Sequence, residues 1–459
     1  MQIPEHIFKA YDIRGLVETE LSPELAYGIG KAFVAFLKQK GTDMDGKFLV
    51  LGYDMRKTSQ DYAKRVEQAF LESGVNVRNI GLTSTPVFNF AVAHFEEHVG
   101  GIMVTASHNP AQYNGFKITQ GDGMPIGKNS GMDEIRRLVV EANWSAVEDS
   151  PAQAEAFDAQ APYVERIFSL VSPDTIKPLK VVIDGGNGMA GAVLPHWIKR
   201  LPVEVEYLYI EPDGTFPNHE ANPIKVETLE DLQKKVVEVG ADFGFALDGD
   251  ADRIGLVDEK GNVVDASFVG ALLGQKILES QPGAHMLYDL RSSQIIPEIW
   301  EQGGATTEKC MVGHALIKGM MRKVGAVFAS ELSLHVYFGS MYNMESTDLC
   351  LLYFLQMLSE SDKSLSQLVA PLSKYVHSGE MNFEVKDKNG VLAVIEQKYS
   401  EQALEVSHLD GLWMRFDWGW VSLRQSNTEP VLRLNLETNS KQLTREKGEE
   451  FVQIIMSGN

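Results

Sequence analysis

A serine in a polar loop is the first candidate for covalent chemistry in this chain. Ser107 lies in the run Thr105-Ala106-Ser107-His108-Asn109-Pro110, directly after the apolar residues 102–104, which we expect to form a strand. A serine hydroxyl presented by such a loop can serve as a nucleophile, although Asn109-Pro110 is also typical of an ordinary turn. Further along the chain, Lys117 could reach a phosphoryl oxygen or take a proton from a substrate.

Three aspartates at alternate positions are the second candidate. The run Asp248-Gly249-Asp250-Ala251-Asp252-Arg253 follows another apolar stretch, residues 243–247. Small residues between the carboxylates let the three side chains turn toward one hard cation such as Mg²⁺. The alternative is a solvated acidic turn, but a cation would relieve the repulsion between the three carboxylates. Magnesium beside a serine is suited to phosphoryl transfer.

The charges at such a site do not balance without nearby cations. Three aspartates, one Mg²⁺ and a phosphoserine of about −2 leave a total of about −3. We therefore expect Arg14, Lys117 and Arg253 to lie close to the serine and the metal. The net charge of the whole chain is −21, which makes a general attraction to nucleic acid or to anionic membrane unfavourable. An anionic substrate must instead be held by a local cluster of Arg and Lys.

A third loop offers groups that bind hydroxyls. The run Glu331-Leu332-Ser333-Leu334-His335 follows the apolar residues 326–329. Glu331 and Ser333 could bind two hydroxyls of a sugar ring, and the imidazole of His335 titrates near neutrality. A surface glutamate beside a loop histidine with no role in binding remains the alternative.

A fourth loop combines groups that suit a phosphate dianion. Arg424-Gln425-Ser426-Asn427-Thr428-Glu429-Pro430 supplies a fixed guanidinium, two hydroxyls, an amide and loop backbone N–H groups. A surface turn is the alternative. Trp413, Trp418 and Trp420, which precede this loop, are most simply core and strand-face residues of the same domain.

The elements that must position these loops form a pattern that occurs three times. Each unit begins with a short apolar strand, at residues 48–51, 181–183 and 286–288, and a later strand of each unit runs into one of the first three loops. Strands alternating with helical stretches predict α/β domains with mixed, largely parallel sheets. Because active sites of such sheets lie beyond the carboxyl ends of the strands, we expect the loops to surround a central cleft. Such alternation is common in α/β proteins, so a chance resemblance between the units is the alternative.

The pattern of predicted helices and strands changes after about residue 370. A helix near residues 391–406, strands at 412–416, 418–423 and 431–436, and a final helix predict a smaller α+β domain. A length of 459 residues is too great for one core. The predicted domains are 1–150 with the serine, 151–256 with the metal loop, 257–370 with the sugar loop, and 371–459 with the phosphate loop as a C-terminal lid.

Composition favours a cytoplasmic enzyme. Only two cysteines, Cys310 and Cys350, are present, which fits a reducing compartment. The N-terminal residues do not resemble a signal peptide, and no uncharged apolar run approaches the ~18 residues of a membrane span. We therefore expect no membrane partner and no nucleic-acid partner.

The four loops, in this order, resemble the α-D-phosphohexomutase superfamily over essentially the whole chain. Tyr11-Asp12-Ile13-Arg14-Gly15 is similar to the opening motif of that family, and the loops at Ser107, Asp248, Glu331 and Arg424 are similar to its phosphoserine, magnesium, sugar and phosphate loops. The phosphate loop, together with Pro212-Asp213-Gly214-Thr215-Phe216-Pro217-Asn218-His219, looks most like the bacterial phosphomannomutase/phosphoglucomutase branch.

The sugar loop departs from the family pattern at two positions. The family usually has glycine where this chain has Ser330 and Leu334. Leucine does not easily adopt a positive φ, so we expect this loop to follow another backbone path, with Glu331, Ser333 and His335 still available for the sugar. Selectivity among sugars is the property that this change would affect.

The resemblance implies an interconversion of hexose 1-phosphate and hexose 6-phosphate, of mannose, glucose or both, through phospho-Ser107 and a hexose 1,6-bisphosphate that is both intermediate and activator. Mg²⁺ would be held by the three aspartates and Ser107. It further implies hexose phosphates as partners and a monomer or weak homodimer. The implied catalytic residues are Ser107, Arg14, His108, Lys117, Arg253 and His335; the substrate-binding residues are Tyr11, His314, Lys318, Glu331, Ser333, Arg424, Ser426, Asn427 and Thr428; the metal ligands are Ser107, Asp248, Asp250 and Asp252.

Three other functions remain as alternatives. A phosphoglucosamine mutase would share all of this chemistry. A metal-dependent sugar phosphatase would pass the phosphoryl group to water, but it would have no use for a second phosphate loop. A non-catalytic sensor of sugar phosphates would not need a serine beside a magnesium loop.

Overall fold

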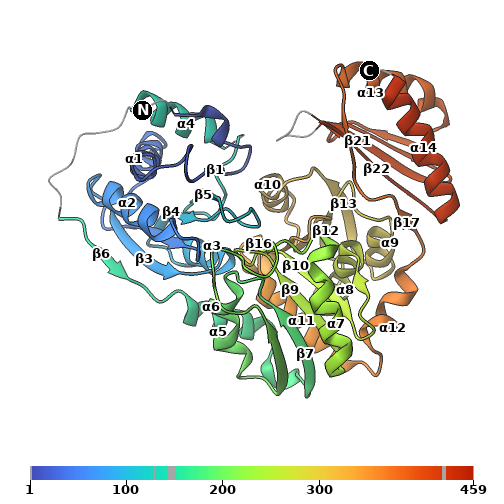
Figure 1. Cartoon of the computed structure of the whole chain (residues 1–459), viewed down its shortest axis with the longest axis horizontal. Helices are drawn as coiled ribbons and strands as arrows, with labels where there is room; N and C mark the ends of the chain where they lie inside the picture. The colour runs from blue at the N-terminus through green and yellow to red at the C-terminus, as the bar shows by residue number, and fades with distance from the viewer. Residues whose placement is uncertain (1–2, 129, 143–150, 426–430, 458–459) are drawn as a thin grey trace. The chain divides into compact units, whose positions relative to one another are not determined.

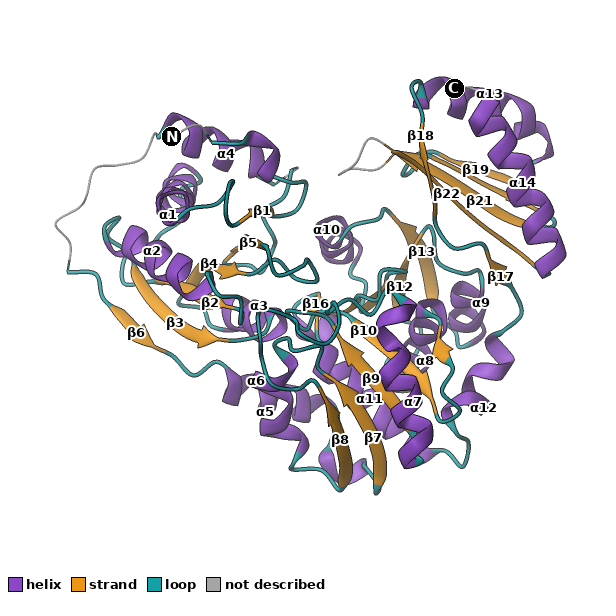
Figure 2. Cartoon of the chain, viewed as in Figure 1, coloured by secondary structure: helices purple, strands orange, loops and turns teal. Residues whose placement is uncertain are grey.

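The computed structural model describes residues 3–128, 130–142, 151–425 and 431–457 (Figure 1). The chain divides into two compact units, one formed by Met1–Val264 and Ser333–Ser366 and the other by Asp265–Leu332 and Gln367–Asn459. Helices and strands alternate through most of the chain, as Figure 2 shows. Within the described residues, we find no helix with the length and apolar character needed to span a membrane.

The first unit begins with a six-stranded mixed sheet. Its strand order is β1-β5-β4-β2-β3-β6. β4, β2, β3 and β6 run parallel to one another, β5 pairs antiparallel with β4, and β1 pairs antiparallel with β5. The elements are β1 (Ile13–Leu16), α1 (Pro23–Gln39), β2 (Phe48–Tyr53), α2 (Ser59–Leu71), β3 (Asn76–Leu82), α3 (Thr85–His94), β4 (His98–Val104), β5 (Tyr113–Gln120), α4 (Met132–Glu141) and β6 (Ala154–Ala156).

Apolar side chains on β2 and β4 point to both faces of this sheet, which explains why helices pack against it on both sides. Leu49, Leu51, Ile102 and Val104 are buried in one apolar core with residues of α1, α2 and α4, whereas Gly101, one position out of phase, lies against Phe88 of α3. Successive side chains of a strand point to opposite faces, so β2 and β4 bury both faces. The strands are thereby fixed, and the loops that follow them are held at one edge of the sheet.

A second mixed sheet lies in the same unit. Its order is β11-β10-β9-β7-β8. β7, β8 and β9 run parallel to one another, β10 pairs antiparallel with β9, and β11 pairs antiparallel with β10. The elements are α5 (Gln160–Leu170), β7 (Leu179–Asp184), α6 (Ala190–Ile198), β8 (Val203–Leu208), α7 (Glu230–Val239), β9 (Phe243–Leu247), β10 (Ile254–Asp258), β11 (Val263–Val264), the antiparallel pair β15 (Val336–Phe338) and β16 (Met344–Glu345), and α11 (Thr347–Glu360).

The second unit contains a parallel α/β portion followed by an antiparallel sheet. In the α/β portion β12 pairs with both β13 and β14. The elements are α8 (Ala266–Ser280), β12 (His285–Asp289), α9 (Ile295–Gln302), β13 (Thr306–Cys310), α10 (His314–Val324) and β14 (Phe328–Ser330), then α12 (Leu365–Val369), β17 (Val376–His377), β18 (Met381–Glu384), α13 (Lys388–Tyr399), β19 (Glu405–Ser407), β20 (Leu412–Phe416), β21 (Gly419–Gln425), β22 (Val431–Thr438) and α14 (Lys441–Ser457).

The antiparallel sheet has two different faces. One face carries Leu412, Leu423 and Leu434, which are buried with residues of α13 and α14. On the other face Trp413 and Trp420 form a buried cluster with Leu290 and Val312 of the α/β portion. Both tryptophans are therefore core residues, as the sequence predicts.

The predicted fold class is confirmed: three α/β domains with mixed sheets precede a C-terminal domain with an antiparallel sheet. The helix predicted over residues 391–406 was wrong at both ends. It runs from Lys388 to Tyr399, and Glu405–Ser407 form strand β19 instead. Asp387 explains the early start, because its side chain accepts a hydrogen bond from the N–H of Gly390 as a helix cap.

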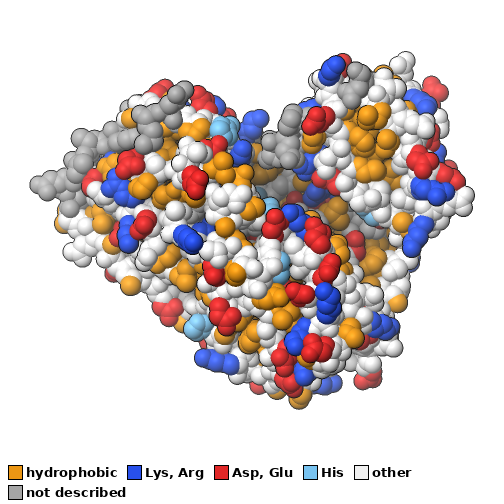
Figure 3. All heavy atoms as spheres, in the orientation of Figure 1, with side chains coloured by type: hydrophobic (Ala, Val, Ile, Leu, Met, Phe, Trp, Pro, Cys, Tyr) orange, Lys and Arg blue, Asp and Glu red, His pale blue; other side chains and the backbone are white. Residues whose placement is uncertain are grey.

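The surface agrees with the acidic composition. On the face drawn in Figure 3, Asp and Glu side chains are interspersed with Lys and Arg. Exposed positive charge is therefore not gathered into one large patch on that face.

Candidate active site

Ser107 directly follows the end of β4 and is buried in a tight turn. Its side chain and backbone are 2% exposed, and its φ is 50°, in the left-handed region. The hydroxyl lies 2.9 Å from Asp248 Oδ2, to which it donates a hydrogen bond, and 3.2 Å from His108 Nδ1. A non-glycine residue in this conformation costs roughly 1–2 kcal/mol, so the surrounding contacts must hold the turn in place.

The three aspartates lie together after β9. Asp248, Asp250 and Asp252 are at most 4% exposed, and one oxygen from each lies within 4.8 Å of the other two. Ala251, at φ 61°, turns the chain between them. Asp248 Oδ1 accepts hydrogen bonds from the N–H groups of Asp252 and Arg253 at 3.0 and 3.1 Å, which fixes the loop.

The aspartate cluster fits a hard divalent cation. Asp250 Oδ1 is buried and accepts no hydrogen bond from the described residues, and three converging carboxylate oxygens are the donor set that Mg²⁺ prefers. Burial, followed by the charges of Asp252 and Asp250, raises the pKa of Asp248 to about 7. The carboxylates thus repel one another strongly, and a bound cation would relieve that repulsion.

Lys117 supplies positive charge to the same cluster. It lies on β5, and its Nζ is 2.6 Å from Asp250 Oδ2 and 2.6 Å from Asp252 Oδ2. Burial alone lowers the pKa of Lys117, but the two carboxylates raise it by more, so the net shift is upward and the side chain stays protonated. Thr85, at the start of α3, also donates to Asp250 Oδ2, at 2.5 Å.

Arg253 and His335 lie on the other side of the aspartates. Arg253 Nε lies 3.2 Å from His335 Nε2 and 3.9 Å from Asp248 Oδ2. His335 Nε2 is also 3.4 Å from Asp252 Oδ1, and its Nδ1 is 3.0 Å from Ser333 Oγ. The structure therefore brings His335 and Ser333 of the predicted sugar loop to the metal loop.

His108 and Arg14 complete the surroundings of Ser107. Arg14 follows the first residue of β1 and donates to Asn109 Oδ1 at 2.6 Å, which joins the opening motif to the serine loop. Tyr11 is half-buried just before β1. Burial, together with the charges of Arg253 and Arg14, holds the pKa of His108 well below its usual value. His108 is therefore a neutral imidazole at physiological pH.

The expected change of backbone path at Leu334 is wrong in its premise, because Leu334 does adopt a positive φ, of 70°. The carbonyl of Leu334 accepts the N–H of Ile254 at 3.2 Å, and its side chain is 9% exposed. Burial and this hydrogen bond offset the strain of roughly 1–2 kcal/mol. Ser330, the other substituted glycine position, is the last residue of β14 and needs no left-handed conformation.

Two of the predicted binding residues belong to a network of charged side chains in the second unit. Glu331 lies 3.4 Å from Arg291, which pairs with Asp289 at 2.6 Å. Arg424, 3% exposed, lies 3.9 Å from Glu380 and 4.0 Å from Asp410. Burial and the neighbouring Arg291 lower the pKa of Arg424. Among the described residues, the buried Nε of Arg424 has no hydrogen-bond partner.

For the remaining predicted residues the structure gives the position in the fold of two and does not describe the other three. His314 and Lys318 lie in the first turns of α10, and Lys318 is 4% exposed. Ser426, Asn427 and Thr428 lie outside the described residues.

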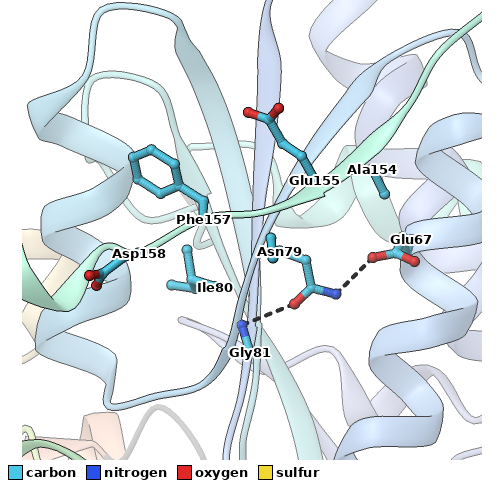
Figure 4. A pocket seen from close by; sticks show the side chains of 9 residues that line it. Glu67, Asn79, Ile80, Gly81, Ala154, Glu155, Phe157 and Asp158 are labelled. Carbon is cyan, nitrogen blue, oxygen red and sulfur yellow. Dashed lines mark hydrogen bonds between the residues drawn. The ribbon is translucent and has the colours of Figure 1, made fainter.

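The described residues of the first unit line at least two hollows. One, of about 210 Å³, adjoins the serine loop and is lined by His108, Asn109, Pro110, Ala111, Gln112, Thr215, Phe216, Glu220 and Ala221. The larger, of about 720 Å³, lies between β3 and β6 (Figure 4), where the side chain of Asn79 is bonded to Glu67 and to the N–H of Gly81. It contains none of the predicted site residues, so the smaller hollow is the one relevant to the serine.

Sequence reasoning missed two residues that support the site, Arg56 and Thr85. Each lies just beyond the end of a strand and contacts a loop distant in sequence. A signal for Arg56 exists, because the first strand of the first and third repeats is followed by Asp-x-Arg, at Asp54-Met55-Arg56 and Asp289-Leu290-Arg291. In both, the aspartate accepts the N–H of the arginine, at 3.0 and 2.8 Å.

Four family models together match most of the chain. They describe alpha/beta/alpha domains I, II and III of phosphoglucomutase/phosphomannomutase, over residues 5–145, 161–261 and 265–375, and the C-terminal domain, over residues 380–454. The chain belongs to the phosphoglucomutase/phosphomannomutase family. It is thus an enzyme of the phosphohexomutase class, and the superfamily suggested by its four loops is confirmed.

Relatives of this family cover nearly the full length. A protein of Xanthomonas campestris pv. campestris described as phosphohexose mutases is 38% identical over 452 residues, which are 98% of this chain and 99% of the relative. A phosphomannomutase of Escherichia coli K12 is 36% identical over 439 residues, 94% of each chain. A solved phosphoglucomutase/phosphomannomutase family protein from Burkholderia thailandensis has a TM-score of 0.91 and 30% identity, covering 100% of this chain and 98% of that one.

Proposed function

We propose that this phosphohexomutase interconverts hexose 1-phosphate and hexose 6-phosphate, with mannose, glucose or both as the sugar, through phospho-Ser107 and a hexose 1,6-bisphosphate. The observation that carries the proposal is the hydrogen bond of 2.9 Å between Ser107 Oγ and Asp248 in a buried aspartate cluster. A phosphorylated serine at this position lies against the groups that would hold a metal ion.

The residues around Ser107 take defined parts in this scheme. Asp248, Asp250 and Asp252, with an oxygen of the phosphorylated serine, would hold Mg²⁺, which would neutralise charge on the transferred phosphoryl group. Arg14 and Arg253 lie close enough to contribute positive charge to the same group.

Proton transfer falls to Lys117 and His335. The two carboxylates beside Lys117 keep its ammonium protonated, so Lys117 is a proton donor before it can be an acceptor. His335 lies beside Asp252 and Arg253, and His108 is neutral and within reach of Ser107 Oγ. We assign general acid–base transfer to Lys117 and His335, and orientation of the serine to His108.

The distal end of the substrate is assigned to residues of the second unit and the sugar loop. Arg424 would donate from its guanidinium to a phosphate dianion, and Ser426, Asn427 and Thr428 would complete that clamp. Glu331 and Ser333 would bind sugar hydroxyls, and Tyr11, His314 and Lys318 would contact the substrate. The C-terminal domain that carries Arg424 would act as a lid that keeps the bisphosphate from escaping.

One alternative is a phosphoglucosamine mutase, which differs only in the sugar. The other is a phosphatase, in which water replaces the sugar hydroxyl as acceptor. The match to a C-terminal domain of the family favours a mutase, because the phosphate loop proposed there would be a second phosphate clamp, which hydrolysis does not need.

The test is a product assay with Mg²⁺ and a trace of glucose 1,6-bisphosphate. Mannose, glucose and glucosamine 1-phosphates are supplied side by side, and both the 6-phosphate and free inorganic phosphate are measured. A mutase forms hexose 6-phosphate without stoichiometric phosphate release. Release of one phosphate for each sugar consumed would contradict the proposal, and activity confined to glucosamine would select the alternative sugar.

A further inference from the structure

We propose that Arg56 is a positioning residue of the mutase reaction, which holds the backbone of the Ser107 loop in its reactive shape. This inference rests on the function proposed above. Arg56 lies just beyond β2, is 3% exposed, and is more than fifty positions from the serine in sequence.

The guanidinium of Arg56 uses all five of its N–H donors. Nη1 donates to the carbonyls of Pro110 and Tyr113 at 2.8 and 2.9 Å. Nη2 donates to the carbonyls of Ser107 and Asn109 at 2.8 and 2.5 Å. Nε donates to Asp54 Oδ2 at 3.2 Å. Since arginine has five donors in a fixed planar fork, four loop carbonyls and one carboxylate satisfy it completely.

The arginine itself is fixed by its own turn. Asp54 Oδ1 accepts the backbone N–H of Arg56 at 3.0 Å and the hydroxyl of Ser59 at 2.5 Å. The N–H of Asp54 donates to the carbonyl of Val104, at the end of the strand that leads into the serine loop. Position and orientation of the guanidinium are therefore set by β2 and β4 together.

Phe216 closes the site of Arg56 from the second sheet's domain. The guanidinium carbon lies 5.1 Å from the centre of the Phe216 ring, a distance typical of a cation–π contact. The chain leading to this ring passes so close that a Cβ on Gly214 would lie 2.6 Å from Arg56 Cα. Phe216 and the chain at Gly214 thus cover part of Arg56, which is 3% exposed.

These contacts bear on catalysis because the serine turn is strained. Ser107 has a φ of 50°, and its carbonyl is held by Arg56 in a buried turn without regular secondary structure. Unpaired buried carbonyls are costly, so without the guanidinium the turn would relax and move Ser107 Oγ. A displacement of about 1 Å at a reacting group can reduce the rate by about 100-fold.

The test compares Arg56→Lys with a matched control, Arg78→Lys. Arg78 is an arginine of the same domain, paired with Glu97 and Glu155 and stacked 4.4 Å from the rings of Phe48 and Phe157. Two of its partners, Glu155 and Phe157, appear in Figure 4, in the hollow away from the serine. Both substitutions keep the charge and lose the planar fork, but only Arg56→Lys removes support from the serine loop.

We expect Arg56→Lys to lower kcat by about 10- to 100-fold, which corresponds to roughly 1.4 to 2.8 kcal/mol. KM should stay within about threefold, because Arg56 holds the serine loop and not the substrate. The substitution should equally slow the single-turnover transfer of a phosphoryl group from glucose 1,6-bisphosphate to dephosphorylated Ser107, followed by intact mass. In hydrogen exchange, the amides of residues 105–113 should lose protection. Arg78→Lys should leave kcat, KM, the transfer rate and the protection of these amides at the wild-type values.

The outcomes separate the inference from the proposed function. Wild-type kcat and transfer rate in folded Arg56→Lys, or an equal loss in Arg78→Lys, would overturn the role of Arg56 alone. An inactive wild-type enzyme would overturn the proposed function instead. If Arg56→Lys does not fold, Asp54→Asn keeps the shape of the turn and removes the charge that orients the guanidinium. It should lower kcat by about 3- to 10-fold without changing KM, and an unchanged kcat would refute the inference.

Discussion

Lys117→Met should lower stability in metal-free buffer and make the protein more responsive to Mg²⁺. The ammonium of Lys117 lies 2.6 Å from two buried carboxylates, Asp250 and Asp252. Removing one partner of a buried ion pair leaves uncompensated charge and costs about 3–5 kcal/mol. Methionine keeps most of the side-chain volume, so the loss of charge dominates. In EDTA the free energy of unfolding should therefore fall by about 3–5 kcal/mol.

Magnesium should recover much of this loss. A cation that binds the folded protein at a concentration 100-fold above its Kd stabilises it by about 2.7 kcal/mol. In the wild-type protein Mg²⁺ must displace or reorganise the Lys117 ammonium, whereas in Lys117→Met it meets open carboxylates. The variant should thus bind Mg²⁺ more tightly and yet lose mutase activity, because the proposed proton donor is gone. Urea unfolding in EDTA and across a Mg²⁺ titration measures the first effect, and the product assay measures the second.

Lys234→Met is the control for this experiment. Lys234 forms an exposed pair with Glu230, 3.4 Å away, and exposed pairs contribute about 0–1 kcal/mol. It should change neither stability nor the response to Mg²⁺. If Lys117→Met were as stable as the wild type in EDTA, or if Mg²⁺ stabilised neither protein, the aspartates and Lys117 would not form the charge cluster that the structure describes.

Two further variants test other parts of the site, and a third tests Glu437, a buried carboxyl of strand β22. Asp250→Asn should weaken Mg²⁺ binding and reduce turnover far more than it changes folding; full activity of the EDTA-treated wild type would contradict the metal's role. Arg424→Ala should weaken sugar-phosphate binding by about 10- to 150-fold, since charge-assisted hydrogen bonds contribute about 1.5–3 kcal/mol, and should release more 1,6-bisphosphate; unchanged KM and leakage would remove Arg424 from the clamp. Burial raises the pKa of Glu437 from 4.5 to about 7, so its contribution to stability is complete below pH 4.5 and is lost as the pH rises through 7. Relative to Glu437→Gln, the wild type should lose about 3 kcal/mol between pH 4 and pH 8, and parallel pH profiles of unfolding would refute this shift.

The chemistry of the loops could be predicted from sequence because it depends on residue type and short spacing. Three aspartates at alternate positions converge as soon as the strand before them is fixed, and β9 ends where the apolar run ends. The charge sum at the metal loop also predicted nearby cations: Lys117 and Arg253 lie beside the aspartates, whereas Arg14 contacts Asn109 of the serine loop. That inference needs no knowledge of the fold, only that a buried site cannot carry several unpaired charges.

The backbone conformation of Leu334 and the contacts of Arg56 with the serine loop could not be predicted from the sequence in this way. Leu334 adopts a φ of 70° because a hydrogen bond from Ile254 and burial of its side chain outweigh the local preference of leucine. Arg56 makes its contacts with backbone carbonyls, which carry no sequence signal at their own positions. In both cases the deciding partner is a group distant along the chain, and only the folded structure brings it near.

The central claim, that Ser107 carries and transfers the phosphoryl group, is tested most directly by following that group onto the protein. Dephosphorylated enzyme is mixed with glucose 1,6-bisphosphate and Mg²⁺, and intact mass and peptide mapping are recorded as hexose monophosphate forms. The account predicts a gain of about 80 Da, one phosphoryl group, confined to the peptide that contains Ser107. Ser107→Ala should show neither the gain nor mutase turnover. A phosphoryl group on another residue, or wild-type turnover by Ser107→Ala, would contradict it.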